Sequence, residues 1–297
     1  MNTLNTLILF NREGYEESAQ DTTIYNELKS IWLEVFDEAD SDKYADMFLL
    51  HHSDYSGLAY REEGKIVSML FLIPCFWDGN AGYYVYACAT LPQFRGKGYM
   101  KTLLDAAFEK AQNEKAFGLV LIPANPPLFD FYEKCGFQPF SQIAEYTFVE
   151  TEVVGNGFDC VESSDFATIT DMRNRFYEQH FAVQFGLSHI QHVQNRMVNE
   201  QGATLVFEHD GKSGYAFCVY DGINEKVVVL EWVLLSDTLQ QDIPLFFKGI
   251  CRYFDVSELS VRSKIGLGLG CERPFSMIRL CSEKSIPKYP YFNLGLE

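Results

Sequence analysis

The sequence has no long apolar run. A helix that crosses a membrane needs about 18 to 20 consecutive apolar residues, and the longest candidate, Val67–Trp77, is interrupted by Ser68 and Pro74. The N-terminal stretch MNTLNTLILF has no basic region, and its apolar part is too short for a secretory leader. We therefore expect a cytoplasmic protein with no membrane partner.

Positive charge is also scarce. The chain has 24 Lys and Arg residues against 41 Asp and Glu, which gives a formal net charge of −17. Binding to nucleic acid depends on basic side chains that neutralise phosphates, so the composition argues against a nucleic-acid partner. The acidity is compatible with a cationic substrate, but the need for solubility explains it equally well.

The sequence lacks paired cysteines and any clear metal-ligand spacing. Its 8 cysteines occur singly, and most lie in apolar runs, such as those around Cys75, Cys88 and Cys218, where cysteine acts as a small hydrophobic residue. We expect reduced thiols rather than disulfides. His189 and His192 are three residues apart, a spacing more common on one wet helix face than in a metal site. No metal is expected.

The apolar residues, 47% of the 297, suffice for a packed core, and the length favours two domains. Helical spacing predicts helices at 23–36, 44–50, 98–113 and 126–135, and strand patterns are found at 57–61, 66–77, 83–90, 119–122 and 143–150. The segment Glu152–Gly157, which contains Gly-Asn-Gly, is the predicted domain boundary.

The second half repeats this order of elements. Ala59–Ile73 aligns with Val206–Tyr220, including a shared Gly-Lys turn. Predicted helices at 165–177 and 189–197 precede that hairpin, and a strand at 227–236, a helix at 242–254 and a strand at 259–262 follow it. The repeated order favours a duplicated unit. The tail after Arg273 has no counterpart in the first half.

The most informative stretch is Leu91–Met100, LPQFRGKGYM, between a predicted strand and a strongly periodic helix. Two glycines separated by one residue allow a tight turn that directs backbone N–H groups outward. The helix start adds partial positive charge, and Arg95 and Lys97 add full charges. A lone Gly-x-Gly is compatible with an ordinary turn, but the flanking strand and helix favour a diphosphate site. The stretch is neither a Walker loop nor a dinucleotide fingerprint.

Two blocks resemble the GNAT superfamily of acyl-CoA N-acyltransferases. Gln93–Gly98 is similar to the family signature Gln/Arg-x-x-Gly-x-Gly/Ala, and Asn125–Phe137 is similar to its Asn…Tyr-Glu-Lys-x-Gly-Phe element. The specific resemblance covers about residues 23–150 and implies acetyl-CoA as the cofactor. It also implies that the strand before the loop separates from its neighbour, so that its backbone pairs with the pantetheine arm. The implied cofactor-binding residues are Ala89, Thr90, Leu91, Gln93, Phe94, Arg95, Gly96, Lys97, Gly98, Tyr99 and Asn125.

The resemblance implies that Tyr132 is the general acid that protonates the departing thiolate. A tyrosine with a pKa of about 10 is neutral at pH 7 and suits this task. The alternative is that Tyr132 is one more aromatic residue on a buried helix face. Leu128 departs from the small residue usual in the family, which affects packing near the pantetheine. Because the family uses direct attack by the amine, Cys88 is expected to be a structural thiol.

The second half lacks the glycine pair, since Gln240 and Asp242 occupy the places of Gly96 and Gly98. An aspartate there opposes a diphosphate. The tandem arrangement resembles acetyltransferases of the enhanced-intracellular-survival type, without their sterol-carrier-like domain. The resemblance implies a catalytic domain at 1–150, a degenerate GNAT-like domain at 158–272, and a tail at 273–297 that docks near the active site.

The general base is left open by the residues alone. Glu62, Glu63 and Asp54 are candidates without a discriminating context. In the enhanced-intracellular-survival type the C-terminal carboxylate lies in the active site, so the resemblance implies Glu297 as a catalytic residue.

The expected fold is α/β (α+β), with two tandem GNAT-like domains, each a mixed, mostly antiparallel sheet flanked by helices. The expected function is transfer of an acetyl group from acetyl-CoA to a primary amine of a small molecule or peptide, by direct attack in a ternary complex. A non-catalytic acyl-CoA-binding sensor or scaffold is the alternative. Transfer of a longer acyl or an aminoacyl group also stays open, as does assembly as a homo-oligomer.

Overall fold

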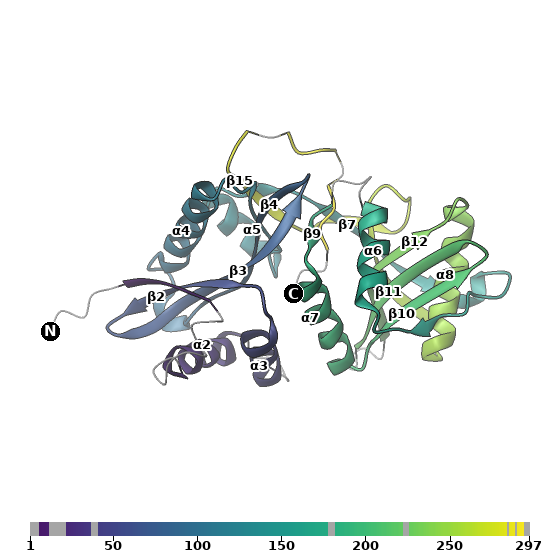
Figure 1. Cartoon of the computed structure of the whole chain (residues 1–297), viewed down its shortest axis with the longest axis horizontal. Coiled ribbons are helices and arrows are strands. Elements are labelled where there is room, and N and C mark those ends of the chain that lie inside the picture. The colour runs from purple at the N-terminus through teal and green to yellow at the C-terminus, as the bar shows by residue number, and fades with distance from the viewer. Residues whose placement is uncertain are drawn as a thin grey trace. The chain divides into compact units, whose positions relative to one another are not determined.

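The computed structural model describes residues 6–11, 22–36, 41–177, 182–221, 226–283, 285–288 and 290–293. They form two compact units, each built around its own sheet (Figure 1). The first unit contains the described residues up to Phe140 and the segment Ser276–Ser285. The second contains Ser141–Phe275 and the described residues from Ile286 onward.

The sheet of the first unit has the strand order β1-β2-β3-β4-β5-β15-β6. Only β4 and β5 pair in parallel within this order, and the other neighbours are antiparallel. The elements are β1 (Thr6–Asn11), α2 (Thr22–Val35), α3 (Ser41–His51), β2 (Ser56–Glu62), β3 (Lys65–Trp77), β4 (Asn80–Thr90), the 3₁₀ turn η1 (Pro92–Phe94), α4 (Tyr99–Asn113), β5 (Gly118–Leu121), α5 (Pro126–Lys134), β6 (Gln138–Pro139) and β15 (Met277–Leu280).

Helices cover both faces of this sheet, which explains why β3 is an almost continuous apolar run. Phe71 of β3 packs against Trp32 of α2 and Phe48 of α3, with ring centroids 6.2 and 5.0 Å apart. Its neighbours Leu70 and Leu72 point to the other face, into a buried cluster with α4 and α5. Alternate residues of one strand therefore fill two separate cores.

The second unit has the strand order β14-β7-β13-β12-β11-β10-β8, in which only β12 and β13 are parallel. α8 packs on one face of this sheet. The elements are β7 (Gln142–Val149), the 3₁₀ turn η2 (Glu150–Glu152), β8 (Val161–Glu162), α6 (Phe166–Tyr177), β9 (Gln184–Phe185), α7 (Leu187–Asn199), β10 (Ala203–His209), β11 (Lys212–Asp221), β12 (Lys226–Leu235), α8 (Leu239–Phe254), β13 (Glu258–Lys264) and β14 (Cys271–Pro274).

The expected fold class is confirmed. Each unit has two leading helices, an antiparallel hairpin, a third strand, a long helix and a strand parallel to the third, in that order. Among the described residues, none of the helices combines the length and apolar character that crossing a bilayer requires.

β7 and β15 join a different sheet from the one that their place in the sequence suggests. β7 lies in the stretch expected to close the first domain, but it pairs with β13 in the second sheet. β15 comes from the tail and pairs with β5 and β6 in the first sheet. The border between the units therefore lies at Phe140 and Ser141 rather than near residue 150. Strand patterns predict that a segment pairs, but not with which partner.

Candidate active site

β4 separates from β5 over most of its length. The two parallel strands pair at Tyr83 and Tyr84, and within the described chain no further β4 residue pairs with β5. The register against β3 shifts between Met69 and Phe71, and Ala87 of β4 has a left-handed φ of 48°. This is a β-bulge, which bends the strand and increases its twist. The separation agrees with the expectation from the resemblance.

The end of β4 is held by Ser68 of β3. The Ser68 hydroxyl donates a hydrogen bond of 3.0 Å to the carbonyl oxygen of Ala89 and lies 2.8 Å from the hydroxyl of Thr90. The backbone N–H of Leu91 donates to the carbonyl of Val67 at 3.0 Å. These bonds fix the last residues of β4 just before the chain turns toward α4.

The glycine loop forms an uncapped helix start. Gly96 and Gly98 have φ values of 78° and 84°, and a Cβ atom on either glycine would meet no heavy atom of the described residues within 4 Å. Gly98 is the N-cap of α4 and has no side chain that could cap the helix. The helix begins with the bond from Thr102 N to Gly98 O, at 3.0 Å. The cap residue therefore leaves the N–H groups of the first turn without a side-chain acceptor of its own, as an anion site requires.

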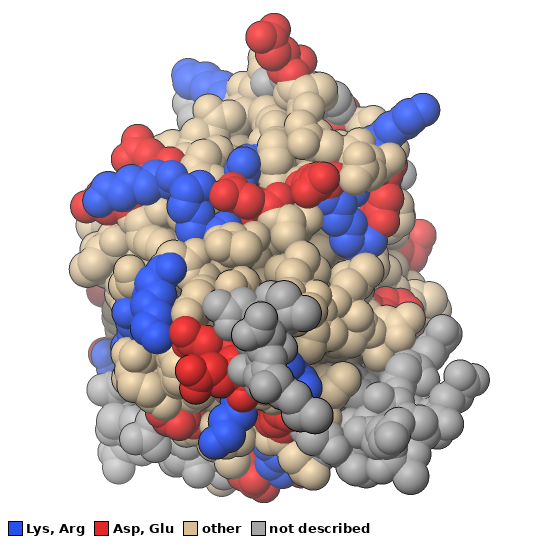
Figure 2. All heavy atoms as spheres, turned by 90° about the vertical axis from the view of Figure 1, so that its left-hand side faces the viewer, with Lys and Arg blue, Asp and Glu red and all other residues tan. Residues whose placement is uncertain are grey.

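The two basic residues of the loop differ in their surroundings. The exposed Arg95 donates from Nε to the carbonyl oxygen of Thr90 at 3.1 Å. The Nζ of Lys97 lies 3.3 Å from both carboxylate oxygens of Glu62 and 4.8 Å from the ring centroid of Phe94. Figure 2 likewise shows Lys and Arg side chains beside Asp and Glu on one face of the molecule. The sequence carries no local signal for the contact with Glu62, which lies 35 residues away.

Tyr132 points from α5 toward the bulge of β4. Its side chain is 6% exposed, and its hydroxyl interacts with the thiol of Cys88. Burial raises the pKa of Tyr132 well above its usual value, and burial also raises the pKa of Cys88 to about 12. Both groups are therefore neutral near pH 7. Tyr132 can act as a proton donor, and Cys88 lacks the thiolate that a nucleophile needs.

Asn125 occupies the N-cap of α5. It is exposed, has extended backbone angles, and its side chain makes no capping hydrogen bond. Its carbonyl oxygen accepts a bond from the N–H of Leu128 at 3.1 Å. The Asn125 amide is therefore not used to cap its own helix. Glu297, the expected catalytic residue of the tail, lies outside the described residues.

Residues 22–137 match the model of the acetyltransferase (GNAT) family. They form a GNAT acetyltransferase domain. The matched range contains the bulged strand, the glycine loop, Asn125 and Tyr132. No curated protein matches the sequence.

Several solved structures share the fold of the whole chain. A probable N-acyltransferase from Enterococcus faecalis is 16% identical with a TM-score of 0.73, and the match covers 94% of this chain and 73% of the other. A GCN5-related N-acetyltransferase from Anabaena variabilis is 14% identical with a TM-score of 0.70, over 93% and 73%. Eis1 from Mycobacterium abscessus is 10% identical with a TM-score of 0.65, over 94% and 74%. The tandem arrangement around the GNAT domain is thus shared with acyltransferase structures.

The helix start of the second unit differs from that of the GNAT domain. Asp242, in the first turn of α8, is 3% exposed and accepts a bond from Lys212 at 2.8 Å and from Thr238 at 2.6 Å, besides one from Ser236. Burial raises the pKa of Asp242, but the bonds from Lys212, Ser236 and Thr238 outweigh it and hold the pKa below its usual value. A carboxylate thus already occupies the start of α8.

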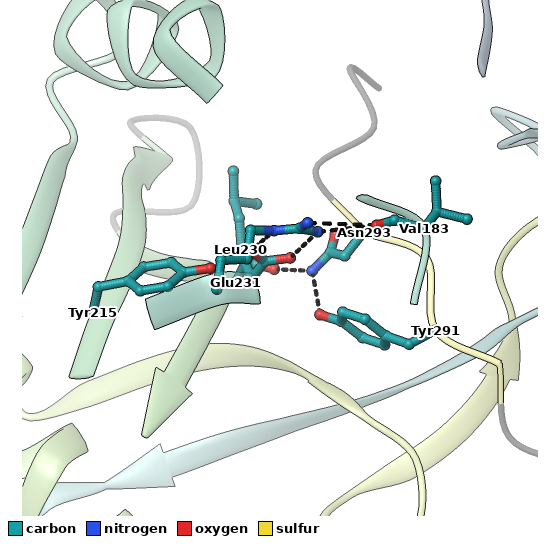
Figure 3. Close-up of polar contacts among 7 residues, drawn as sticks. Val183, Tyr215, Leu230, Glu231, Tyr291 and Asn293 are labelled. Atoms are coloured by element: carbon teal, nitrogen blue, oxygen red, sulfur yellow. Dashed lines mark hydrogen bonds and ion pairs between the residues drawn. The ribbon is translucent and has the colours of Figure 1, made fainter. Parts of the chain in front are cut away.

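A buried polar network lies beside β12 of the second unit (Figure 3). The side chains of Arg173 and Glu231 are 1% and 0% exposed and form an ion pair of 2.9 Å, and the Tyr215 hydroxyl donates to Glu231 at 2.6 Å. Asn293 of the tail donates from Nδ2 to the carbonyl oxygen of Leu230 at 2.7 Å. The sequence did not indicate this network, because its members come from α6, β11, β12 and the tail.

Proposed function

We propose that the protein is an N-acetyltransferase that moves an acetyl group from acetyl-CoA to a primary amine of a small molecule or peptide. The observation that carries the proposal is the uncapped Gly96–Gly98 loop at the end of a strand that has left its neighbour. The loop offers N–H groups to a diphosphate. The strand offers backbone groups to the amides of an extended pantetheine arm.

In this proposal the cofactor lies along β4 and the start of α4. The N–H groups of Gly96–Tyr99 bind the diphosphate, with Gln93 and Phe94 on the turn before them. The backbone at Ala89–Leu91 pairs with the pantetheine, and the Asn125 side chain contacts the cofactor from the start of α5. The positive charge of Arg95 favours the anion electrostatically.

The proposed reaction is direct attack within a ternary complex. The amine nitrogen bonds to the thioester carbonyl carbon, and the carbon–sulfur bond then breaks. Tyr132 gives its proton to the departing sulfur, and a base takes a proton from the amine. Following the resemblance, we propose the C-terminal carboxylate of Glu297 as that base, on the tail 273–297. Backbone groups near Thr90 polarise the thioester carbonyl.

We further propose that the second unit, within 158–272, binds no cofactor. Asp242 supports this, because its carboxylate places a negative charge in the first turn of α8, near where a diphosphate would bind. A second anion there would be repelled by like charge.

Calorimetric titration with acetyl-CoA tests the cofactor site. Gly98→Asp puts a carboxylate at the helix start, and Gly266→Asp is a matched control, since Gly266 also has a positive φ of 86° and open space around it. We expect the wild type and Gly266→Asp to bind alike, and Gly98→Asp to bind at least about tenfold more weakly. Absence of binding by the wild type, or equal binding by Gly98→Asp, would overturn the proposal.

Acceptor-dependent release of free CoA thiol tests the enzymatic part. The acceptors to compare are polyamines, aminoglycosides, amino acids and peptides. An enzyme releases CoA at a rate that rises with the concentration of at least one amine. Tight acetyl-CoA binding without such release would instead support the sensor or scaffold alternative.

A further inference from the structure

The end of β2 is tied to both neighbours of Gly98. The carboxylate of Glu62 pairs with Lys97 on one side and interacts with the hydroxyl of Tyr99 on the other. The ring of Tyr99 also stacks on Tyr60 of β2, with centroids 4.4 Å apart and planes inclined by 18°. Three contacts from one strand therefore hold the residues before and after the left-handed Gly98.

These contacts shift the pKa values of Glu62 and Tyr99. The interaction with Tyr99 and the ion pair with Lys97 lower the pKa of Glu62, and the interaction with Glu62 raises the pKa of Tyr99 to about 12. Glu62 thus stays ionised and Tyr99 stays neutral near pH 7. A carboxylate stabilised in its charged form is a weaker base, so Glu62 is a poor candidate for deprotonating the amine.

The charge of Lys97 is already compensated. Its Nζ has both Glu62 oxygens at 3.3 Å and lies 4.8 Å from the ring centroid of Phe94 and 5.8 Å from that of Tyr99. Arg95 differs, because its Nε bonds a backbone carbonyl, that of Thr90, and its side chain is exposed. A carbonyl bears no formal charge that could offset the guanidinium, and Arg95 forms no ion pair with any of the described residues.

We propose that Glu62 is a positioning residue of the glycine loop, and that Arg95 rather than Lys97 supplies the side-chain charge for the cofactor's diphosphate. Glu62 acts by holding Lys97 and Tyr99, which orients the peptide groups on both sides of Gly98. This inference rests on the proposed binding of acetyl-CoA. It assigns positioning of the loop to Glu62 and the side-chain charge to Arg95.

The direction in which removal of Glu62 changes the affinity for the cofactor distinguishes a positioning role from a purely electrostatic one. Glu62 is a negative charge near the site of an anion, so charge alone predicts that removing it tightens binding. Positioning predicts the opposite, because a looser loop must be ordered when the cofactor binds. Salt screens the charge effect at the exposed loop, whereas the ordering cost does not depend on salt.

The experiment is calorimetry with acetyl-CoA at about 50 and 300 mM KCl, a range over which screening changes strongly. We expect Glu62→Ala to bind about fivefold more weakly and Arg95→Met about tenfold more weakly. Lys97→Met should weaken binding about threefold and keep the salt dependence of the wild type, whereas Arg95→Met should reduce that dependence. Glu109→Gln on the exposed side of α4 and Lys115→Met in the exposed turn after α4 are the charge controls.

A double variant isolates the link between Glu62 and Lys97. If Lys97 acts through Glu62, Glu62→Ala/Lys97→Met should bind no more weakly than Glu62→Ala alone. Glu62→Gln loses the ion pair but keeps an acceptor for Tyr99, so its affinity should lie between those of the wild type and Glu62→Ala. A thermal unfolding midpoint like that of the wild type shows that each variant is folded.

Two results would overturn the inference while leaving the proposed function intact. One is unchanged or tighter binding by Glu62→Ala and Glu62→Gln. The other is a salt dependence that falls in Lys97→Met as much as in Arg95→Met. If the wild type does not bind acetyl-CoA, the proposed function fails first, and the inference fails with it.

Discussion

The hydroxyl of Tyr132 interacts with the thiol of Cys88, and this contact links α5 to the bulge of β4. Burial raises the pKa of both groups, so each keeps its proton near pH 7. The pair places a neutral proton donor beside the strand that would carry the thioester in the proposed function. The protonated state of both groups supports the proposed general acid at Tyr132 and gives no support to a nucleophile at Cys88.

The first prediction concerns the proton of Tyr132. Tyr132→Phe keeps the ring, which contacts Phe131 and Phe137 at centroid distances of 5.2 and 5.8 Å. We expect turnover to fall about 100-fold, the lower range for a lost general acid, with acetyl-CoA affinity changed less than about threefold. Release of CoA thiol and calorimetry measure the two quantities. The control Cys88→Ala should keep most of the activity. Full activity of Tyr132→Phe would show that Tyr132 is not the general acid. Loss of activity in Cys88→Ala would instead indicate a catalytic role for the thiol.

The second prediction concerns the C-terminal carboxylate. Deleting the last three residues, 295–297, should abolish turnover and leave acetyl-CoA binding intact, because the proposed base acts on the amine and not on the cofactor. A chain extended by one glycine moves the carboxylate without removing residues and should also be impaired. Truncated protein with unchanged turnover would exclude Glu297 as the base.

The third prediction concerns the buried ion pair of Arg173 and Glu231. Arg173→Met leaves a buried carboxylate without its partner and should lower the free energy of unfolding by about 3–5 kcal/mol. Arg173→Met/Glu231→Leu should lower the free energy of unfolding by less than the sum of the two single changes, because neither charge is then buried without its partner. Urea unfolding measures these values. Arg175→Met is the control, since Arg175 has an exposed side chain and a change there should cost less than about 1 kcal/mol. A loss as small as that of the control would show that the pair contributes little.

The fourth prediction concerns pH and Asp242. Its pKa is lower in the folded protein than in the unfolded chain, so its stabilising effect is present above about pH 4 and is lost as the pH falls through the folded value. Asp242→Asn should therefore be less stable than the wild type at pH 7, and the difference should shrink on acidification. Urea unfolding across that range tests this, with the exposed Asp237→Asn as a control. A difference that is constant with pH would contradict the assignment.

Local patterns sufficed for much of the fold. The glycine loop, Asn125 and Tyr132 could be proposed as site residues because each belongs to a short motif whose residues are neighbours along the chain. The order of helices and strands in both units was also predictable, since periodicity reports which side of a segment is buried. β1 was missed, because its short apolar run Leu7–Phe10 is continuous and shows none of the polar–apolar alternation of a half-buried strand.

The amino-acid sequence therefore determines that two similar α/β units form and that only the first carries the glycine loop. Tertiary structure decides which strands share a sheet, as with β7 and β15, and which charges meet, as with Glu62 and Lys97 or Arg173 and Glu231. The reason is that periodicity and turn residues act over a few positions, whereas pairing and burial join residues 35 or 58 positions apart. Such contacts depend on the whole packed core.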